Sequence, residues 1–208
     1  MHPLIPRLRQ ARIIPVVRAS TAARAATAVA WLQQAGLTVF EITMTVPEAP
    51  ALIRALSADP ALLVGAGTVP DAATAQACLE AGARFIVAPW VDATLAAPVQ
   101  EAGACLMLGA LTPTEVRAAL QAGADVVKIF PAGSVGGPAH IKALRAVFPD
   151  VAFCPTGGVD ARNAPDYLAA GAAFVGIGGK LVDEALVAAG DRAAVMRAAE
   201  DALGIMRA

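Results

Sequence analysis

Apolar runs recur along the chain, and most of them follow a stretch that ends in Ala-Gly. Five segments show this ending: QQAGLTVF, LEAGARFIV, QEAGACLML, LQAGADVVKIF and LAAGAAFVGI. Their glycines are Gly36, Gly82, Gly103, Gly123 and Gly171. Glycine just past a helix end adopts the left-handed conformation that closes a C-terminal cap. Each Ala-Gly therefore predicts a helix that stops and a strand that begins.

The spacing of these glycines gives the repeat. Successive gaps are 46, 21, 20 and 48 residues, one or two steps of about 20 to 24, the length of a strand, a helix and two short loops. In the two double steps Pro60 and Pro149 end the helix instead, since proline cannot continue one. The pattern predicts eight strands, near residues 13–18, 38–43, 61–65, 84–88, 104–108, 125–130, 151–155 and 173–177.

Proline and acidic residues mark several of the helix starts. Thr112-Pro-Thr-Glu115 reads as a capping box with proline at the first helical position. Pro47-Glu48 and Pro70-Asp71 also place proline and an acid in a predicted first turn.

Alternating βα units of this length imply parallel strands, and eight of them imply a closed (β/α)8 TIM barrel rather than an open sheet. Residues 1–12 are expected to form a short N-terminal helix over the lower end of the barrel, and Asp191 to Ala208 a closing helix. We expect one domain over residues 1–208, with a core of small and branched aliphatics, because 57% of the residues are hydrophobic and only 4% aromatic.

Composition excludes several classes of protein. Gly, Pro or a charge interrupts every apolar stretch before the roughly 18 residues of a spanning helix, and the first residues lack the apolar segment of a signal peptide. The formal net charge is −1 and no basic run stands out, which argues against nucleic-acid and membrane-surface binding. Three scattered cysteines without C-x-x-C spacing fit a reduced cytoplasm, with Cys105 and Cys154 as buried hydrophobes. The expected partners are small molecules and other copies of the chain.

Barrel enzymes place their chemistry at the C-terminal ends of the strands, so polar residues late in the apolar runs are the informative ones. Lys128 lies inside VVKIF of the sixth strand, in a chain with thirteen arginines and only three lysines. Burial disfavours the charged ammonium and leaves a nucleophilic amine, which arginine cannot supply. A lysine that reaches solvent or pairs with a neighbouring acid is the structural alternative.

Glu41 is enclosed by apolar neighbours in VFEIT of the second strand. A buried carboxylate is costly unless it is paired, protonated or functional, and a structural pair with Lys128 is one interpretation. Schiff-base chemistry requires the same two groups, an amine that attacks a carbonyl and a carboxyl that moves protons. We favour the functional interpretation.

Glycine-rich segments follow the seventh and eighth strands, at Gly157-Gly158 and Gly176-Ile-Gly-Gly179. In this fold, backbone amides at a helix N-terminus commonly bind phosphate there, although such glycines also occur in plain turns. Gly65-Ala-Gly-Thr68 is expected to be a third close-backbone loop, facing the oxo-acid end of a substrate. His2 and His140, without clustered acids, give no metal site, and His140 is expected on a helix surface.

The motifs EITMTVP, VGAGTV, KIFPAG and PTGG occur in this order at the second, third, sixth and seventh strands. From about Ile13 to Val182 the chain closely resembles the 2-keto-3-deoxy-6-phosphogluconate aldolases, including enzymes that also act on 4-hydroxy-2-oxoglutarate. The resemblance implies a class I aldolase, typically a homotrimer, that uses neither a cofactor nor a metal. It implies that Lys128 forms the Schiff base, that Glu41 is the general acid/base, that Thr68 helps to hold the pyruvyl carboxylate, and that Thr156 influences stereochemistry.

The chain departs from the family pattern at the mouth of the barrel. Thr45 stands where many members have an arginine that binds the pyruvyl carboxylate, and Arg18 is the expected substitute. Gly179, beside Lys180, stands where many have a phosphate-binding serine, so backbone amides and Lys180 hold phosphate, or it is held less tightly. The expected substrate-binding residues are Arg18, Thr43, Thr68, Pro89, Phe130, Thr156, Gly157, Gly158, Gly178 and Gly179.

These observations predict cleavage of 2-dehydro-3-deoxy-6-phosphogluconate to pyruvate and glyceraldehyde 3-phosphate, and also of 4-hydroxy-2-oxoglutarate to pyruvate and glyoxylate. Two alternatives stay open: a sugar-phosphate isomerase or epimerase on the same fold, and a barrel that only binds a phosphorylated metabolite. Both leave Lys128 without a role.

Overall fold

The computed structural model describes the backbone of residues 1–207 and the side chains of residues 1–205. Eight parallel strands pair in the order β7-β6-β5-β4-β3-β2-β1-β8, and an isolated bridge between Thr156 and Gly176 closes the barrel between β7 and β8. The strands are β1 (Ile13–Val17), β2 (Val39–Thr43), β3 (Leu63–Gly67), β4 (Phe85–Ala88), β5 (Cys105–Ala110), β6 (Val126–Ile129), β7 (Phe153–Pro155) and β8 (Val175–Ile177). The predicted (β/α)8 barrel is confirmed.

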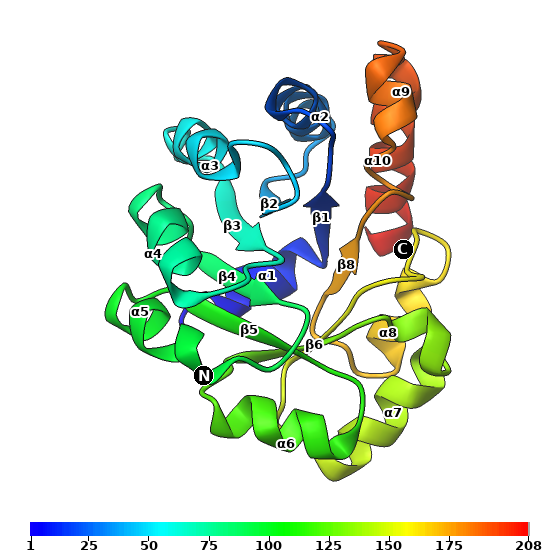
Figure 1. Ribbon diagram of the computed structural model, residues 1–208. Coiled ribbons are helices and arrows are strands. Elements are labelled where there is room, and N and C mark those ends of the chain that lie inside the picture. Colours follow the sequence, from blue (N-terminus) through cyan, green and yellow to red (C-terminus); the bar gives the residue numbers. More distant parts are fainter. Residues whose placement is uncertain (208) are drawn as a thin grey trace.

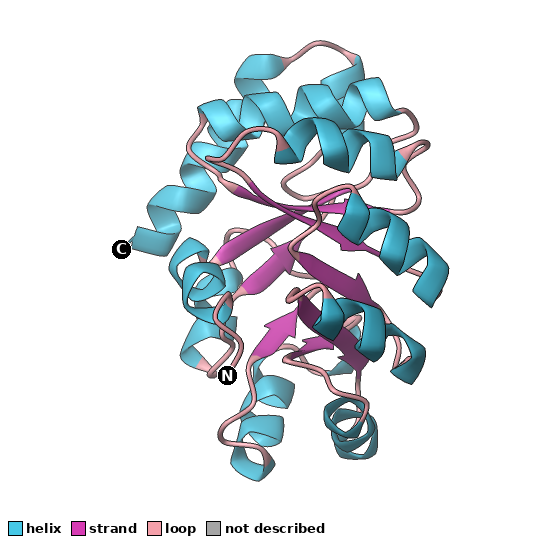
Figure 2. Cartoon of the chain, turned by 90° about the vertical axis from the view of Figure 1, so that its left-hand side faces the viewer, coloured by secondary structure: helices cyan, strands magenta, loops and turns pink. Residues whose placement is uncertain are grey.

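Helices cover the outside of the barrel, as Figure 1 shows along the barrel and Figure 2 from the side. They are α1 (Ile5–Ala11), α2 (Ala22–Gln34), α3 (Ala49–Ser57), α4 (Ala72–Glu80), α5 (Ala96–Glu101), α6 (Pro113–Gln121), α7 (Pro138–Val147), α8 (Ala164–Ala169), α9 (Glu184–Ala188) and α10 (Arg192–Arg207), with 3-10 turns η1 (Ala93–Leu95) and η2 (Ala132–Val135). The closing helix is confirmed as far as residue 207, and Ala208 lies outside the described residues. Among the described helices none combines the length and the apolar character needed to cross a membrane.

All five Ala-Gly segments end a helix, as predicted. Their glycines have φ between +63° and +105°. After α2, for example, the amide of Leu37 donates to the carbonyl of Leu32 at 3.1 Å, the bond that defines a Schellman cap. The helix-to-strand boundaries therefore follow from the sequence directly.

The N-terminal helix α1 covers one end of the barrel, as predicted. Its Ile5 and Leu8 are buried against side chains from inside the strands, including Phe85 and Phe174. In Figure 1 the helix crosses the middle of the ring of strands. Beneath α1 the interior of the barrel is a packed apolar layer, and the polar groups lie at the other end.

The predicted loop Gly65-Ala-Gly-Thr68 is wrong, because Gly65 and Gly67 belong to β3, which runs two residues further than expected. Glycine serves here for space rather than for a turn. A Cβ on Gly65 would lie 2.2 Å from the ring of Phe85, and one on Gly67 would lie 2.1 Å from Glu41 Oε1. The two glycines make room for large side chains inside the barrel.

The helix starts are confirmed in part. Thr112 and Glu115 form the capping box, with the Glu115 amide 3.3 Å from Thr112 Oγ1 and the Thr112 amide 2.7 Å from Glu115 Oε2. Pro47 and Pro70 lie before their helices rather than in the first turn, because α3 begins at Ala49 and α4 at Ala72. Asp71 is the N-cap of α4, whereas Glu48 at the N-cap of α3 is left-handed with no side-chain cap bond.

The interpretation of the cysteines as buried hydrophobes is confirmed. Cys78, Cys105 and Cys154 are free and buried. Burial raises the pKa of the Cys78 thiol to about 11 and that of Cys154 to about 12, so both stay uncharged near neutral pH. His140 lies on α7 as expected; it is half-buried, and its Nε2 is 2.7 Å from the carbonyl of Leu111.

Candidate active site

Glu41 and Lys128 meet inside the barrel because side chains alternate along a strand. Glu41 lies two residues beyond Val39 on β2, and Lys128 two residues beyond Val126 on β6; both valines belong to the inner apolar cluster. The charged groups therefore also point inward, one layer nearer the C-terminal ends of the strands. Lys128 Nζ is 3.2 Å from Glu41 Oε1, and each residue is only 4% exposed.

Lys128 and Glu41 thus form the ion pair that the structural interpretation of both residues expected. A buried pair is a weak source of stability, because desolvation of two charges offsets their attraction. The pair lies at the end of the barrel where this fold carries its chemistry, and the Phe130 ring centroid is 5.7 Å from Lys128 Nζ. The arrangement supplies an amine in reach of a carboxylate that can exchange protons with it.

A pocket of about 500 Å³ opens at this mouth, a size typical of small-molecule sites. It gathers seven of the ten predicted substrate-binding residues: Arg18, Phe130, Thr156, Gly157, Gly158, Gly178 and Gly179. Phe130 also faces Lys128, and Thr156 follows Cys154, the β7 partner of Lys128 in the strand register. The pocket therefore adjoins the amine.

The loops after β7 and β8 form one wall of the pocket. Gly157 and Gly158 have φ of +83° and +76°, and a Cβ on Gly158 would lie 2.9 Å from the Cα of Gly133. Within the described residues, the amides of Gly158, Gly179 and Lys180 donate no hydrogen bond. These three amides can serve an anion.

The amides at the start of α9 are not available for an anion. The carboxylate of Asp183 accepts from the amides of Ala185 and Leu186 at 2.8 Å and 3.3 Å. On this wall of the pocket, the amides that remain for an anion are therefore those of the preceding loops.

Two cations and two carboxylates line the same pocket. Asp183 caps α9, and Glu184 accepts from the Ser20 amide and from Arg24. The side chains of Arg18 and Lys180 make no hydrogen bond or ion pair with any described residue. The carboxylates are occupied and the cations are free, which favours an anionic ligand. Our sequence reasoning missed Asp183 and Glu184, although an acid before a helical run is a typical N-cap signal.

The other predicted substrate-binding residues lie outside the lining of this pocket. Thr43 is fully buried and its Oγ1 donates to the carbonyl of Val17 at 3.1 Å, with Thr45 Oγ1 at 2.6 Å. Thr68 directly follows β3, and its φ is +55°, a conformation that a β-branched residue rarely adopts and that is typical of functional sites. Pro89 is half-buried after β4. These positions belong to the β2 to β4 side of the mouth.

Comparison with known proteins identifies the family. A family model described as KDPG and KHG aldolase matches residues 4–198. The chain belongs to this aldolase family. A 2-dehydro-3-deoxy-phosphogluconate aldolase of Pseudomonas aeruginosa is 38% identical over 94% of this chain and 89% of its own length. A probable 2-dehydro-3-deoxy-6-phosphogalactonate aldolase of Rhizobium meliloti is 37% identical over 92% of both chains.

One solved structure similar to this chain contains a covalently bound pyruvate. The KDPG aldolase of Legionella pneumophila, with pyruvate captured as a covalent carbinolamine intermediate, superposes with a TM-score of 0.85 at 30% identity, over 94% of this chain and 96% of that chain. In that aldolase, pyruvate is bound covalently to the protein.

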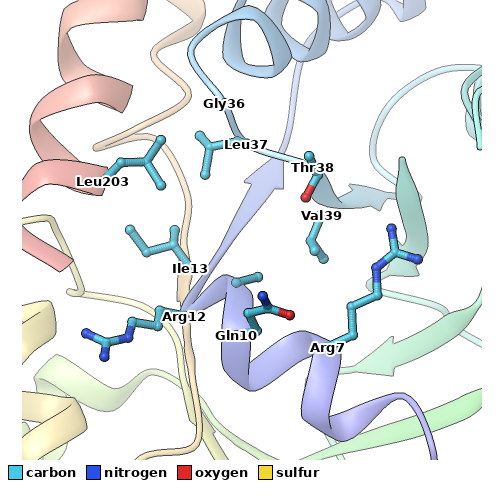
Figure 3. A pocket seen from close by; sticks show the side chains of 10 residues that line it. Arg7, Gln10, Arg12, Ile13, Gly36, Leu37, Thr38, Val39 and Leu203 are labelled. Atoms are coloured by element: carbon cyan, nitrogen blue, oxygen red, sulfur yellow. The ribbon is translucent and has the colours of Figure 1, made fainter. Parts of the chain in front are cut away.

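A second cavity, of about 570 Å³, lies at the opposite end of the aldolase barrel (Figure 3). It lies between α1, the start of β2 and α10, and it is lined by Arg7, Gln10, Arg12, Thr38 and Leu203 among others. Ile13 and Val39, the first residues of β1 and β2, also line it. This is the N-terminal end of the strands, where conservation in this fold concerns stability rather than chemistry, so we assign the active site to the Lys128 end.

Proposed function

We propose that this chain cleaves 2-dehydro-3-deoxy-6-phosphogluconate to pyruvate and glyceraldehyde 3-phosphate as a class I aldolase, and that it also cleaves 4-hydroxy-2-oxoglutarate to pyruvate and glyoxylate. The observation that carries the proposal is the buried contact of 3.2 Å between Lys128 Nζ and Glu41 Oε1. It lies beside a pocket whose lining includes the side chains of Arg18 and Lys180. An isomerase, an epimerase or a binding-only barrel leaves the burial of this lysine against a carboxylate unexplained.

Glu41 takes a proton from the Lys128 ammonium, and the free amine attacks the C2 ketone to give a carbinolamine. Glu41 returns the proton to the hydroxyl group, which leaves as water, and an iminium forms. Glu41 removes the proton of the C4 hydroxyl, and the bond between C3 and C4 breaks as the aldehyde forms. The iminium accepts the electron pair and becomes an enamine. Protonation of the enamine at C3 and hydrolysis release pyruvate and return the free amine. Neither a metal nor a cofactor takes part in these steps.

The phosphate end of the substrate occupies the wall formed by the loops after β7 and β8. Arg18 and Lys180 supply charge, and the amides of Gly158 and Gly179 supply directional donors. Arg18 was expected to replace the missing carboxylate-binding arginine, but its place among the glycine loops favours the phosphate. Phe130 and Thr156 line the pocket between this wall and Lys128, where Thr156 is in reach of the new carbon centre.

The pyruvyl carboxylate occupies the β2 to β4 side of the mouth. Thr45 replaces arginine there, so neutral donors hold the carboxylate, with Thr68 as the principal one and Thr43 and Pro89 shaping the wall. The strained backbone of Thr68 supports this role, because strain persists where function requires it.

We also propose that the enzyme is a cytoplasmic homotrimer. The family resemblance supports the trimer, and the three free cysteines fit a reducing compartment.

The test of the function is a coupled assay that detects pyruvate released from each of the two substrates. Wild type should release pyruvate from both, and Glu41→Gln should lose about 10²- to 10⁴-fold in kcat while it stays folded. Bound substrate without pyruvate would leave a binding protein, and a rearranged substrate would indicate an isomerase or epimerase. Full activity in Glu41→Gln would return Glu41 to a structural role.

A further inference from the structure

Glu184, the first residue of α9, connects the two segments that flank the pocket. Its Oε1 accepts from the Ser20 amide at 2.7 Å and from Arg24 Nη1 at 3.3 Å. Arg24 Nη1 also donates to Ser20 Oγ at 2.7 Å. We call Ser20, Arg24 and Glu184 the rim latch. It joins the segment after β1 to the segment after β8, although Ser20 and Glu184 are 164 residues apart in the chain.

The rim latch lies beside Arg18, one of the two free cations of the pocket. Only Ala19 separates Arg18 from Ser20, and Val17 ends β1 immediately before Arg18. The short segment that carries the guanidinium is therefore fixed at one end by the barrel and at the other by Glu184. Lys180 and the glycine loop approach the same pocket from the β8 side. The latch thus joins the segment that carries Arg18 to the side of the pocket that carries Lys180.

Arg24 is itself held in place from two directions. It is the third residue of α2, and its amide donates to the N-cap hydroxyl of Thr21 at 3.2 Å. Helix α2 packs against α9, and Figure 1 shows the two side by side. The side chains of Arg24 and Glu184 are 45% and 36% exposed, and exposed ion pairs contribute little to stability. Loss of the latch should therefore alter the pocket far more than the fold.

We propose that Glu184 is a positioning residue for the phosphate end of the substrate: through Ser20 it holds Arg18 at the distance from Lys180 that a phosphate monoester requires. The inference rests on the proposed function, since it assigns the phosphate to this pocket. A guanidinium binds phosphate through paired, directional hydrogen bonds, so a displaced backbone weakens the contact even when the charge remains.

The experiment compares Glu184→Ala, Glu184→Gln, Arg24→Ala and the double alanine variant with wild type. Two readouts separate the ends of the substrate: KM for glyceraldehyde 3-phosphate in condensation with pyruvate, and exchange of pyruvate methyl protons into deuterated water, which requires Lys128 but no phosphate. Glu80→Ala is the matched control, because Glu80 is an exposed carboxylate on α4 that accepts from Gln76 at 2.9 Å.

We expect Glu184→Ala to raise KM for the phosphorylated aldehyde about tenfold, the effect of weakening one charge-assisted contact, with proton exchange unchanged. The KM of Glu184→Gln should lie between those of wild type and Glu184→Ala, because the amide oxygen of glutamine can still accept from the Ser20 amide. The double variant should be no worse than Glu184→Ala, since latch residues act as one unit. An unchanged KM in Glu184→Ala, or a parallel loss of proton exchange, would overturn the latch alone. A wild type with neither exchange nor condensation would overturn the proposed function itself.

Discussion

Gly67 lies beside Thr43 in the register between β2 and β3, so the backbone of β3 passes close to the carboxylate of Glu41. A Cβ at Gly67 would be 2.1 Å from Oε1 and 2.6 Å from Cγ of Glu41. Both distances are far below contact, so any larger residue displaces the glutamate. The position of Glu41, the proposed general acid/base, thus depends on a residue that has no chemistry of its own.

Gly67→Ala should therefore lower kcat by on the order of 10²-fold, as displacement of a catalytic group by about 1 Å does. Steady-state kinetics with the pyruvate-coupled assay measures this effect. Gly204→Ala is the control, because a Cβ at Gly204 meets nothing within 4 Å. A wild-type kcat in a folded Gly67→Ala protein would show that Glu41 does not need its present position.

Single residues also mark the limit of sequence reasoning. Lys128 and Glu41 could be singled out because a charge inside an apolar run is conspicuous. Glu184 could not be found in this way, since an exposed glutamate at a helix start looks like an ordinary N-terminal acid. Its contact with Ser20 depends on closure of the barrel, which brings the segments after β1 and β8 together.

Among the elements, α6 has the most completely specified start. Hydrogen bonds from the amides of Thr112 and Leu111 lower the pKa of Glu115 below its ordinary value. The ionised carboxylate is therefore the form that the fold stabilises. This contribution is fully present above the ordinary pKa of glutamate and is lost as pH falls through the lowered pKa.

Thr112→Ala should cost about 1 kcal/mol of unfolding free energy, the usual effect of losing an N-cap. Glu115→Ala should also destabilise at neutral pH, and its difference from wild type should shrink as the solution is made acidic. Urea denaturation across that pH range measures both effects. Glu101→Ala, at an exposed position on α5, should show neither; a pH-independent difference for Glu115→Ala would contradict the capping role.

The elements were predictable where turns have local chemistry. Glycine at a C-cap and proline near a helix end act through their own backbone, so the sequence alone places these boundaries. The end of β3 was misplaced because Gly65 and Gly67 carry the same local signal as a loop. Glycine is required at these positions because the ring of Phe85 and the carboxylate of Glu41 fill the space that a Cβ would occupy. Both side chains belong to other strands.

At the scale of the whole molecule, the barrel separates stability from chemistry. Beneath α1 the interior of the barrel is a packed apolar layer, in which Leu8 has no exposed surface. The opposite end holds the buried ion pair and the free cations. Eight strands and their order were predictable from the repeat, whereas the pocket was not, because it depends on loops that lie far apart in sequence.

Leu8→Ala should lower the free energy of unfolding by about 2 to 5 kcal/mol, as expected for a large-to-small change in a core, while kcat and KM stay close to those of wild type. Thermal or urea unfolding together with steady-state kinetics measures both properties. Leu120→Ala, at an exposed position, should change neither. A marked loss of activity in folded Leu8→Ala would show that the two ends of the barrel are coupled.

The central claim is that Lys128 forms a covalent imine with pyruvate. Incubation with pyruvate and borohydride, followed by mass spectrometry of the intact chain and of its peptides, tests this claim directly, because borohydride reduces the imine to a stable amine. We predict one reduced pyruvate unit per chain, located on Lys128 and absent from a folded Lys128→Met protein. An adduct on Lys142 or Lys180 alone, or no adduct at all, would contradict the mechanism.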